Sequence, residues 1–224
     1  MKQNLKQLSL RHQLILSICA TAIAVIFTIL VANFNLKPIG PQASSVGFAD
    51  FNQQVASIFP YNKFWHQLTS LALGFPILVA GIYAIFGLSQ LIKYKKFSKI
   101  SPQLYLLAGF YFATILVYII FEKLALNFRP VILKDGLEAS YPSTHALLAV
   151  CFCGSAISVN RFFIKSRSKL RYINLLLVLL IIFIVVGRIL AGVHWATDII
   201  GGLIIAAALL SIFQTILLYS RQTK

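Results

Sequence analysis

The stretch at residues 172–218 reads YINLLLVLLIIFIVVGRILAGVHWATDIIGGLIIAAALLSIFQTILL, and it decides the class of fold. Two apolar runs, each close to the ~20 residues that a helix needs to cross a bilayer, flank a short polar interval. The interval contains Arg188, His194 and Asp198. Charged groups are costly beside segments this apolar, so we expect the three side chains to face one another or a shared aqueous pocket.

The rest of the chain repeats this alternation of apolar runs and short polar connections. Of its 224 residues, 59% are hydrophobic and 11% are charged, which is more apolar than a soluble domain of this length requires. Six runs are predicted to span a membrane: 13–34, 64–92, 103–122, 143–159, 172–190 and 194–218. We therefore expect an all-α fold, an integral membrane bundle of six transmembrane helices, forming a single domain over residues 1–224.

Two of these runs carry additional information. The first is not followed by a convincing cleavage site of small residues, which predicts a retained helix and not a removed signal peptide. The fourth is short and contains Ser, Cys and Gly residues, so we expect the other helices to enclose it.

The formal net charge of +15 comes from basic residues gathered in short clusters between the apolar runs. This distribution is typical of topology signals in membranes and does not suggest nucleic-acid binding. Of the 20 Lys and Arg residues, 14 lie on one side of the predicted membrane together with both termini, and all five acidic residues lie on the other. We therefore expect a multi-pass protein of the cell membrane with cytoplasmic termini and an outward-facing site. Some of the basic residues of the chain are also expected to attract anionic lipid head groups.

The longest outward segment, residues 35–63, begins with turn-forming Pro, Gly and Ser residues. Apolar side chains then recur at roughly helical spacing, namely Phe48, Phe51, Val55, Ile58 and Phe59. This pattern predicts a short amphipathic helix lying at the membrane interface. A lid over a lipid substrate is the alternative that the pattern leaves open.

The polar interval itself suggests nucleophilic chemistry. His194 and Asp198 are four residues apart and share one face of a helix, so the carboxylate can accept from one ring nitrogen of the imidazole. That contact sets the tautomer and leaves the other nitrogen free to attack. Arg188 offers paired planar donors that fit phosphate oxygens, and Gly192 permits a bend or a close approach of the backbone. A buried histidine with satisfied hydrogen bonds would explain the His194–Asp198 spacing equally well.

A second fragment, Pro142-Ser143-Thr144-His145, opens the fourth run. Proline suits the first turn of a helix, so the amides of Ser143, Thr144 and His145 are expected at a helix N-terminus, where free amides favour an anion. The hydroxyl of Ser143 adds a donor. An ordinary helix start with a histidine at the membrane interface is the plainer alternative.

A third fragment follows the third run and contains Lys123 and Arg129. External helix ends are otherwise poor in cations in this chain, which favours a role for both in binding an anion. Snorkelling toward lipid head groups is the alternative, and it is the better interpretation for Lys134.

Together the three fragments resemble the type 2 phosphatidic acid phosphatase family, which shares its site with vanadium haloperoxidases. The family pattern is Lys-x6-Arg-Pro, then Pro-Ser-Gly-His, then Ser-Arg-x5-His-x3-Asp. This chain has, in the same order, Arg129-Pro130, Pro142-Ser143-x-His145 and Arg188-x5-His194-x3-Asp198. The resemblance covers residues 122–198 by motif, and the six predicted spans extend it to the whole chain.

Three positions depart from the family pattern. Strict spacing places Glu122 where the family has lysine, and Lys123 is one residue closer to Arg129. Thr144 stands in place of the glycine, which keeps the amide and adds bulk. Gly187 stands in place of the serine, which removes a hydroxyl donor.

The resemblance implies a mechanism. His194 attacks phosphorus and forms a phosphohistidine, Asp198 orients it, and His145 protonates the leaving oxygen and then activates water. Arg129, Arg188, Lys123, Ser143 and Thr144 are the expected phosphate-binding residues. These fixed cations and amides take the place of a metal, so we expect no cofactor and a metal-independent phosphoric monoester or diphosphate hydrolase.

The expected substrate is a lipid phosphate, such as phosphatidic acid, phosphatidylglycerol phosphate or an isoprenyl diphosphate. Three alternatives remain open: a catalytically impaired relative that binds lipid phosphate, a lipid phosphotransferase, and a small transporter. Few polar residues occupy the middle of the spans, which speaks against a transport pathway.

Overall fold

The computed structural model describes residues 2–133 and 136–222, and nearly all of its regular structure is helical. In chain order the elements are α1 (Lys2–Asn33), η1 (Pro41–Ala43), α2 (Ala49–Ile58), α3 (Lys63–Ala72), α4 (Gly74–Tyr94), η2 (Phe97–Lys99), α5 (Pro102–Leu124), α6 (Thr144–Phe163), α7 (Arg167–Ala191) and α8 (Ala196–Gln222). Lys134, Asp135 and Lys224, which the charge analysis assigns to sides of the membrane, lie outside the described residues.

Six helical segments in the described part of the chain are long and apolar enough to cross a membrane. They are Leu10–Asn33, Lys63–Tyr94, Pro102–Leu124, Thr144–Phe163, Arg167–Ala191 and Ala196–Ser220. The predicted all-α membrane bundle is therefore confirmed, with boundaries that differ by a few residues. The second span is divided into α3 and α4 near Leu73, and Pro76 in the first turn of α4 has no N–H to donate.

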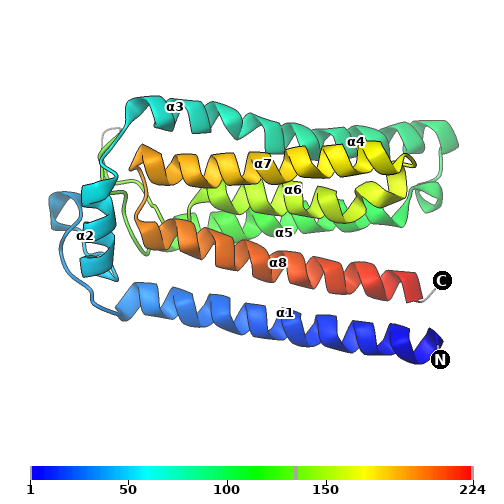
Figure 1. Ribbon diagram of the computed structural model, residues 1–224, viewed down its shortest axis with the longest axis horizontal. Coiled ribbons are helices and arrows are strands. Elements are labelled where there is room, and N and C mark those ends of the chain that lie inside the picture. The colour runs from blue at the N-terminus through cyan, green and yellow to red at the C-terminus, as the bar shows by residue number, and fades with distance from the viewer. Residues whose placement is uncertain (1, 134–135, 223–224) are drawn as a thin grey trace.

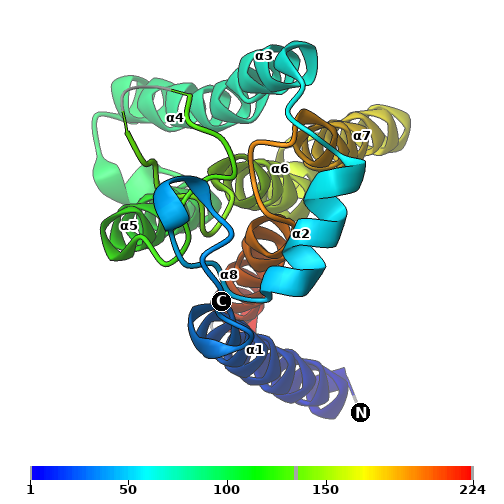
Figure 2. The same ribbon diagram turned by 90° about the vertical axis from the view of Figure 1, so that its left-hand side faces the viewer.

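Helix α6 lies in the middle of the bundle (Figures 1 and 2), as its composition predicts. In its most apolar window 56% of the residues are buried, against 17–39% in the other spans. Small residues let the neighbours approach: a side chain at Gly154 would meet Leu210 at 2.7 Å. The outer helices expose large apolar side chains such as Ile18, Ile85 and Leu176, as lipid contact requires.

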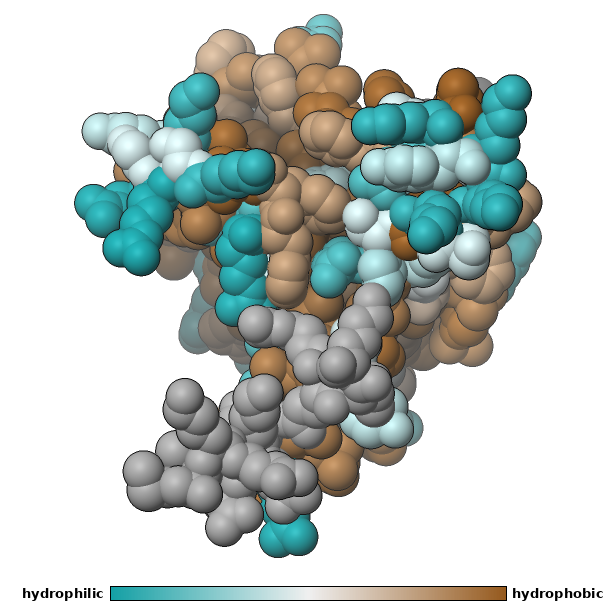
Figure 3. Space-filling view, turned by 90° about the vertical axis from the view of Figure 1, so that its right-hand side faces the viewer, coloured by the Kyte–Doolittle hydropathy of each residue, from teal (hydrophilic) through white to brown (hydrophobic). Residues whose placement is uncertain are grey.

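The two ends of the bundle differ in charge. Figure 1 shows both termini at one end, together with the connections between α4 and α5 and between α6 and α7. Hydrophilic side chains gather on this end (Figure 3), where the exposed basic residues include Arg11, Lys93, Lys95, Lys96, Lys99, Arg161, Lys165, Arg167, Lys169 and Arg171. The opposite end carries α2 and the connections before α6 and before α8, where the motif residues lie.

Helix α2 is the helix expected within residues 35–63, and it lies across this second end (Figures 1 and 2). Its fully buried Asn52 is fastened to the start of α8. The Nδ2 group donates to Thr197 Oγ1 at 2.8 Å, and Oδ1 accepts from the Thr197 amide at 3.1 Å. Phe51 and Ile58 are exposed, so an apolar side of α2 stays available for contact with a bilayer.

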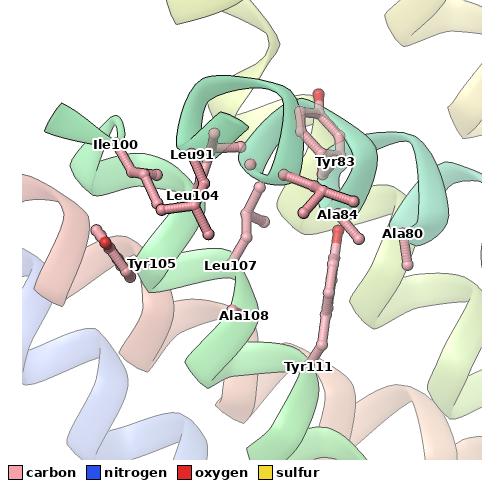
Figure 4. Close-up of a pocket in the computed structure, with 12 residues that line it drawn as sticks. Ala80, Tyr83, Ala84, Leu91, Ile100, Leu104, Tyr105, Leu107, Ala108 and Tyr111 are labelled. Carbon is pink, nitrogen blue, oxygen red and sulfur yellow. The ribbon is translucent and has the colours of Figure 1, made fainter. Parts of the chain in front are cut away.

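An apolar cavity of about 290 Å³ lies between α4 and α5 (Figure 4). Leu91 and Ile100 line it beside the connection at the basic end, and Tyr83 and Tyr111 line it further along the helices. The Tyr83 hydroxyl donates a hydrogen bond to Asn160 Oδ1. This cavity is therefore separate from the motif residues, which lie at the opposite end of the bundle.

Candidate active site

A short hairpin-like segment after α5 brings the first two motif fragments together. Backbone hydrogen bonds join the Arg129 amide to the Glu138 carbonyl (3.0 Å) and the Ser140 amide to the Asn127 carbonyl (2.8 Å). The indole Nε1 of Trp195, from the third fragment, donates to the carbonyl of Phe128 at 2.7 Å. Residues from all three fragments are thus held at one end of the bundle.

The third fragment turns sharply between α7 and α8 at Gly192. This residue has a φ of +61°, a left-handed conformation that glycine adopts without strain. A side chain there would also meet the carbonyl oxygens of Phe59 and Pro60 at 2.6 Å. The close backbone approach expected at Gly192 is therefore to residues 59–60 of the chain itself, which cover the turn that carries His194.

His194 and Asp198 are joined through a residue that the motif analysis does not include. Their closest nitrogen and oxygen, Nδ1 and Oδ2, are 3.9 Å apart, too far for the expected direct hydrogen bond. The Ser140 hydroxyl lies between them, 2.5 Å from Asp198 Oδ2 and 2.9 Å from His194 Nδ1. Ser140 has one proton and donates it to the carboxylate, so its oxygen accepts from the Nδ1–H of His194.

This relay assigns the tautomer of His194. With the proton on Nδ1, the lone pair is on Nε2, which is buried and has no hydrogen-bond partner among the residues that the structure describes. An unsatisfied buried nitrogen is unusual and calls for an explanation such as a ligand. Burial lowers the pKa of His194 well below its ordinary value, and the nearby Arg188, Arg129 and His145 lower it further. The imidazole is therefore neutral near pH 7 and available to attack.

Asp198 is fully buried, and its carboxylate accepts three hydrogen bonds. Besides Ser140, the Asn127 side chain donates to Oδ1 at 3.0 Å and the Trp195 amide donates to Oδ2 at 2.9 Å. Three such donors stabilise the ionised form in a buried place. Asp198 is thus equipped to hold a negative charge close to His194.

The second fragment lies at the start of α6, as predicted, but one of its three amides is not free. The Ser143 amide is not free, because it donates to the Asp198 carbonyl at 2.9 Å. The amides of Thr144 and His145 belong to the first turn of α6 and have no intrahelical acceptor. Ser143 Oγ and both ring nitrogens of His145 are buried without hydrogen-bond partners within residues 2–133 and 136–222. These groups are suited to receive an anion.

The two arginines have different surroundings. Arg188, in the last turn of α7, is fully buried, and its Nε and Nη2 atoms have no hydrogen-bond partner in the described part of the chain. Arg129 Nε lies 3.0 Å from Glu138 Oε2, so part of its charge is balanced by a carboxylate. Both charges act on His194, as its lowered pKa records.

Glu122 and Lys123 are adjacent in the last turn of α5, but only Glu122 lines the polar cavity beside the motif residues. The helix stops at Leu124, and both side chains lie in its exposed last turn. Glu122, Glu138, Arg129 and Thr144 line a polar cavity of about 460 Å³ beside the motif residues, whereas Lys123 does not line it. The residue at the family lysine position therefore faces this cavity as a carboxylate, and the role of Lys123 stays a prediction.

The motifs do not single out five further residues that contact the motif side chains: Asn127, Glu138 and Ser140, and His66 and Thr69 of α3. Arg188 Nη1 lies 3.2 Å from His66 Nδ1 and 3.3 Å from Thr69 Oγ1. An ionisable residue inside an apolar span is a functional signal, and His66 carries that signal. A single serine such as Ser140 carries none. Among the described residues, no cluster of three His, Cys, Asp or Glu side chains could hold a metal ion.

Comparisons with known proteins identify the family and the fold. The family model described as PAP2 superfamily matches residues 80–222. Among solved structures, the chain is similar to the first transmembrane PAP2 type phosphatidylglycerolphosphate phosphatase from Bacillus subtilis, with a TM-score of 0.62 and 13% sequence identity. The match covers 93% of this chain and 98% of that one, and at this identity it establishes a shared fold. No curated protein sequence matches the chain.

Proposed function

This chain belongs to the PAP2 superfamily of membrane phosphatases, and we propose that it hydrolyses a phosphate ester or diphosphate in the head group of a lipid through a phosphohistidine. One observation carries the proposal. His194 is neutral, its Nδ1–H is engaged by the Ser140–Asp198 relay, and its Nε2 is buried and unpartnered among the described residues. That is the arrangement of an activated nitrogen nucleophile.

In the first step the Nε2 lone pair of His194 attacks phosphorus, and the bond from phosphorus to the lipid oxygen breaks. His145 takes up a proton when the anionic phosphate binds beside it, and it gives this proton to that leaving oxygen. The phosphorylated imidazole carries a positive charge, which Asp198 stabilises through Ser140. In the second step His145 takes a proton from water as the water oxygen attacks phosphorus, and the P–N bond breaks to release inorganic phosphate and neutral His194.

Fixed positive groups stabilise the phosphoryl oxygens during both steps. Arg188 Nε and Nη2, Arg129, Ser143 Oγ and the amides of Thr144 and His145 are the donors that support this role. Preorganised donors of this kind supply the charge stabilisation that other phosphatases take from Mg²⁺. Lys123 remains a further proposed phosphate ligand, one that would have to reach in from the exposed last turn of α5.

Two features support a lipid substrate delivered at the outer surface. The motif residues lie at the end of a membrane bundle, and the clustering of basic residues at the other end favours a cytoplasmic location for that end. The polar cavity of about 460 Å³ beside Arg129 offers space for a head group. Phosphatidic acid, phosphatidylglycerol phosphate and isoprenyl diphosphates all fit this description.

The test is phosphate release by the purified protein from mixed micelles of each lipid, with and without a strong chelator. The similar structure is a phosphatidylglycerolphosphate phosphatase, so that lipid is the first to test. We expect turnover that survives the chelator. His194→Ala should abolish it and His145→Ala should reduce it by several orders of magnitude, with non-additive losses in the double variant. Phosphate appearing on an acceptor lipid would identify a phosphotransferase, and binding without release would identify an impaired relative.

A further inference from the structure

Arg188 is held from one side only. Its Nη1 group donates toward His66 Nδ1 at 3.2 Å and Thr69 Oγ1 at 3.3 Å, both on α3. Its Nε and Nη2 groups have no hydrogen-bond partner within the described residues, although the side chain is fully buried. The Nε–H and one Nη2–H lie on the same edge of a guanidinium and point in parallel, which is the edge that binds two oxygens of a phosphate at once.

The two groups of α3 that contact Arg188, Thr69 Oγ1 and His66 Nδ1, act as hydrogen-bond acceptors. The Thr69 hydroxyl donates its proton to the Trp65 carbonyl at 2.7 Å, so its oxygen presents lone pairs to Arg188. Arg188 has only donors, so the neighbouring Nδ1 of His66 must be the acceptor, which leaves the proton of the neutral ring on Nε2. Thr69 and His66 therefore hold Nη1 without adding a counter-charge that would compete with phosphate.

Gly187 makes this contact possible. A Cβ at this position would lie 2.4 Å from Thr69 Cγ2 and 3.4 Å from Trp65 Cε3. Atoms at 2.4 Å overlap, so any larger residue would push α3 away from α7 and withdraw Thr69 and His66 from Arg188. The family pattern has serine here. Glycine removes that hydroxyl donor, and it also admits α3, whose Thr69 oxygen accepts a hydrogen bond from Arg188.

We propose that Thr69 and His66 are positioning residues that orient Arg188 so that its free Nε/Nη2 edge faces the substrate phosphate, and that Gly187 is small to admit them. The inference rests on the proposed phosphatase function. Both residues precede position 80, where the match to the family model begins. The helix before the shared motifs thus completes the phosphate site in this chain.

The first experiment compares single variants by kcat/KM and by inhibition with vanadate, which mimics the five-coordinate phosphorus. Thr69→Val removes the accepting oxygen at similar volume and should lower kcat/KM and weaken vanadate binding about tenfold, the scale of one hydrogen bond to a charged group. Thr69→Ser keeps the oxygen and should restore most of both. His66→Leu should resemble Thr69→Val, while His66→Asn, which keeps an acceptor near the Nδ1 position, should restore part of the loss.

Ser70→Ala is the matched control, because Ser70 is exposed on the same helix and its hydroxyl donates to a backbone carbonyl. It should leave both quantities unchanged. The thermal midpoint in detergent is measured for every variant. Loss of vanadate affinity without loss of the midpoint supports positioning. A Thr69→Val protein that is merely less stable, with normal vanadate affinity, would overturn the proposal.

The second experiment tests Gly187 by combining substitutions. Gly187→Ser restores the family residue, yet it should lower kcat/KM and vanadate affinity because its Cβ meets Thr69 Cγ2. Thr69→Ser removes that methyl group and keeps the oxygen, so the double variant should recover most of the loss. A fully active Gly187→Ser protein, or no recovery in the double variant, would contradict the role of Gly187. If the wild type releases no phosphate, stabilisation by vanadate against heat still tests the Arg188 arrangement by itself.

Discussion

At the scale of single residues, the site depends on Ser140 as much as on the residues of the motifs. Ser140 is 2% exposed and lies between a histidine and a carboxylate that are 3.9 Å apart. Without its hydroxyl, the two groups have no hydrogen-bonded connection in this arrangement. The relay therefore transmits the influence of Asp198 to His194.

Ser140→Ala should consequently lower kcat roughly 10- to 100-fold, the effect of losing a hydrogen bond to a charged group at about 1.5–3 kcal/mol. KM should change little, because Ser140 is not expected to contact the lipid. Single-turnover formation of the phosphoenzyme is the measurement. Ser57→Ala, an exposed serine on α2, is the control. Unchanged phosphoenzyme formation in Ser140→Ala would mean that the relay is dispensable.

The lowered pKa of His194 also predicts how stability depends on pH. In the unfolded chain the imidazole titrates near its ordinary pKa of about 6.5, whereas in the folded protein it resists protonation because it is buried near Arg188 and Arg129. The unfolded state therefore binds more protons as the pH falls below about 6.5, and stability is lost, by up to about 2 kcal/mol at pH 5.

Comparing the wild type with a variant that lacks the imidazole isolates the contribution of His194 to the pH dependence of stability. The thermal midpoint in detergent is measured at pH 7 and pH 5 for the wild type and for His194→Asn, whose amide can still donate to Ser140. The midpoint of the wild type should fall further than that of the variant over this interval. Parallel decreases would show that His194 takes no part in the acid sensitivity.

At the scale of elements, α2 is attached to the site by a buried polar contact. Asn52 pairs with both the hydroxyl and the amide of Thr197 at the start of α8, one residue before Asp198, and its Nδ2 also donates to the Gly47 carbonyl at 2.8 Å. The segment thus supports the first turn of α8. Its exposed Phe51 and Ile58 remain suited to the predicted interfacial position.

Asn52→Ala should therefore destabilise the protein by about 1–3 kcal/mol, because it leaves buried polar groups of Thr197 and Gly47 without partners. The thermal midpoint in detergent reports this loss. Gln53→Ala, at an exposed neighbouring position, should be neutral. Activity should fall together with stability if α2 supports α8; an Asn52→Ala protein of normal midpoint would show that the contact adds nothing.

At the scale of the whole molecule, the two ends of the bundle differ in the residues that they carry. One end collects the exposed basic residues, and the other collects the motif residues (Figures 1 and 3). Membership of the PAP2 superfamily and the membrane bundle confirm the family and the fold class predicted from the motifs and the apolar runs. The orientation of the bundle remains a prediction of the charge bias.

Cysteine labelling tests this orientation. On a background without Cys19, Cys151 and Cys153, a cysteine at Ser166 should be inaccessible to an impermeant thiol reagent added to intact cells. A cysteine at the exposed Gln54 of α2 should react from outside. Permeabilised cells provide the control that both are reactive. The reverse pattern would place the site in the cytoplasm and reject the proposed outer-surface substrate.

The sequence by itself determined the spans, the sorting of charge between the two ends, and the membership of the family. Hydropathy and charge are read segment by segment, so they can be evaluated without knowing which helices touch. His145, His194, Asp198, Arg129 and Arg188 are candidate site residues because their spacing resembles the family motifs, and this spacing is also visible without knowing which helices touch. The short, polar fourth span was also correctly predicted to be enclosed.

Only the tertiary structure decided how these residues are connected. The contact of Ser140 with His194 spans 54 positions and that of Thr69 with Arg188 spans 119, and no local pattern encodes either. Both depend on how closely helices pack, which in turn depends on single small residues such as Gly187. The expected direct pairing of His194 with Asp198 is replaced by a relay. His194 precedes the first residue of α8, Ala196, so the two side chains do not share a helix face, and the Ser140 hydroxyl bridges the 3.9 Å between Nδ1 and Oδ2.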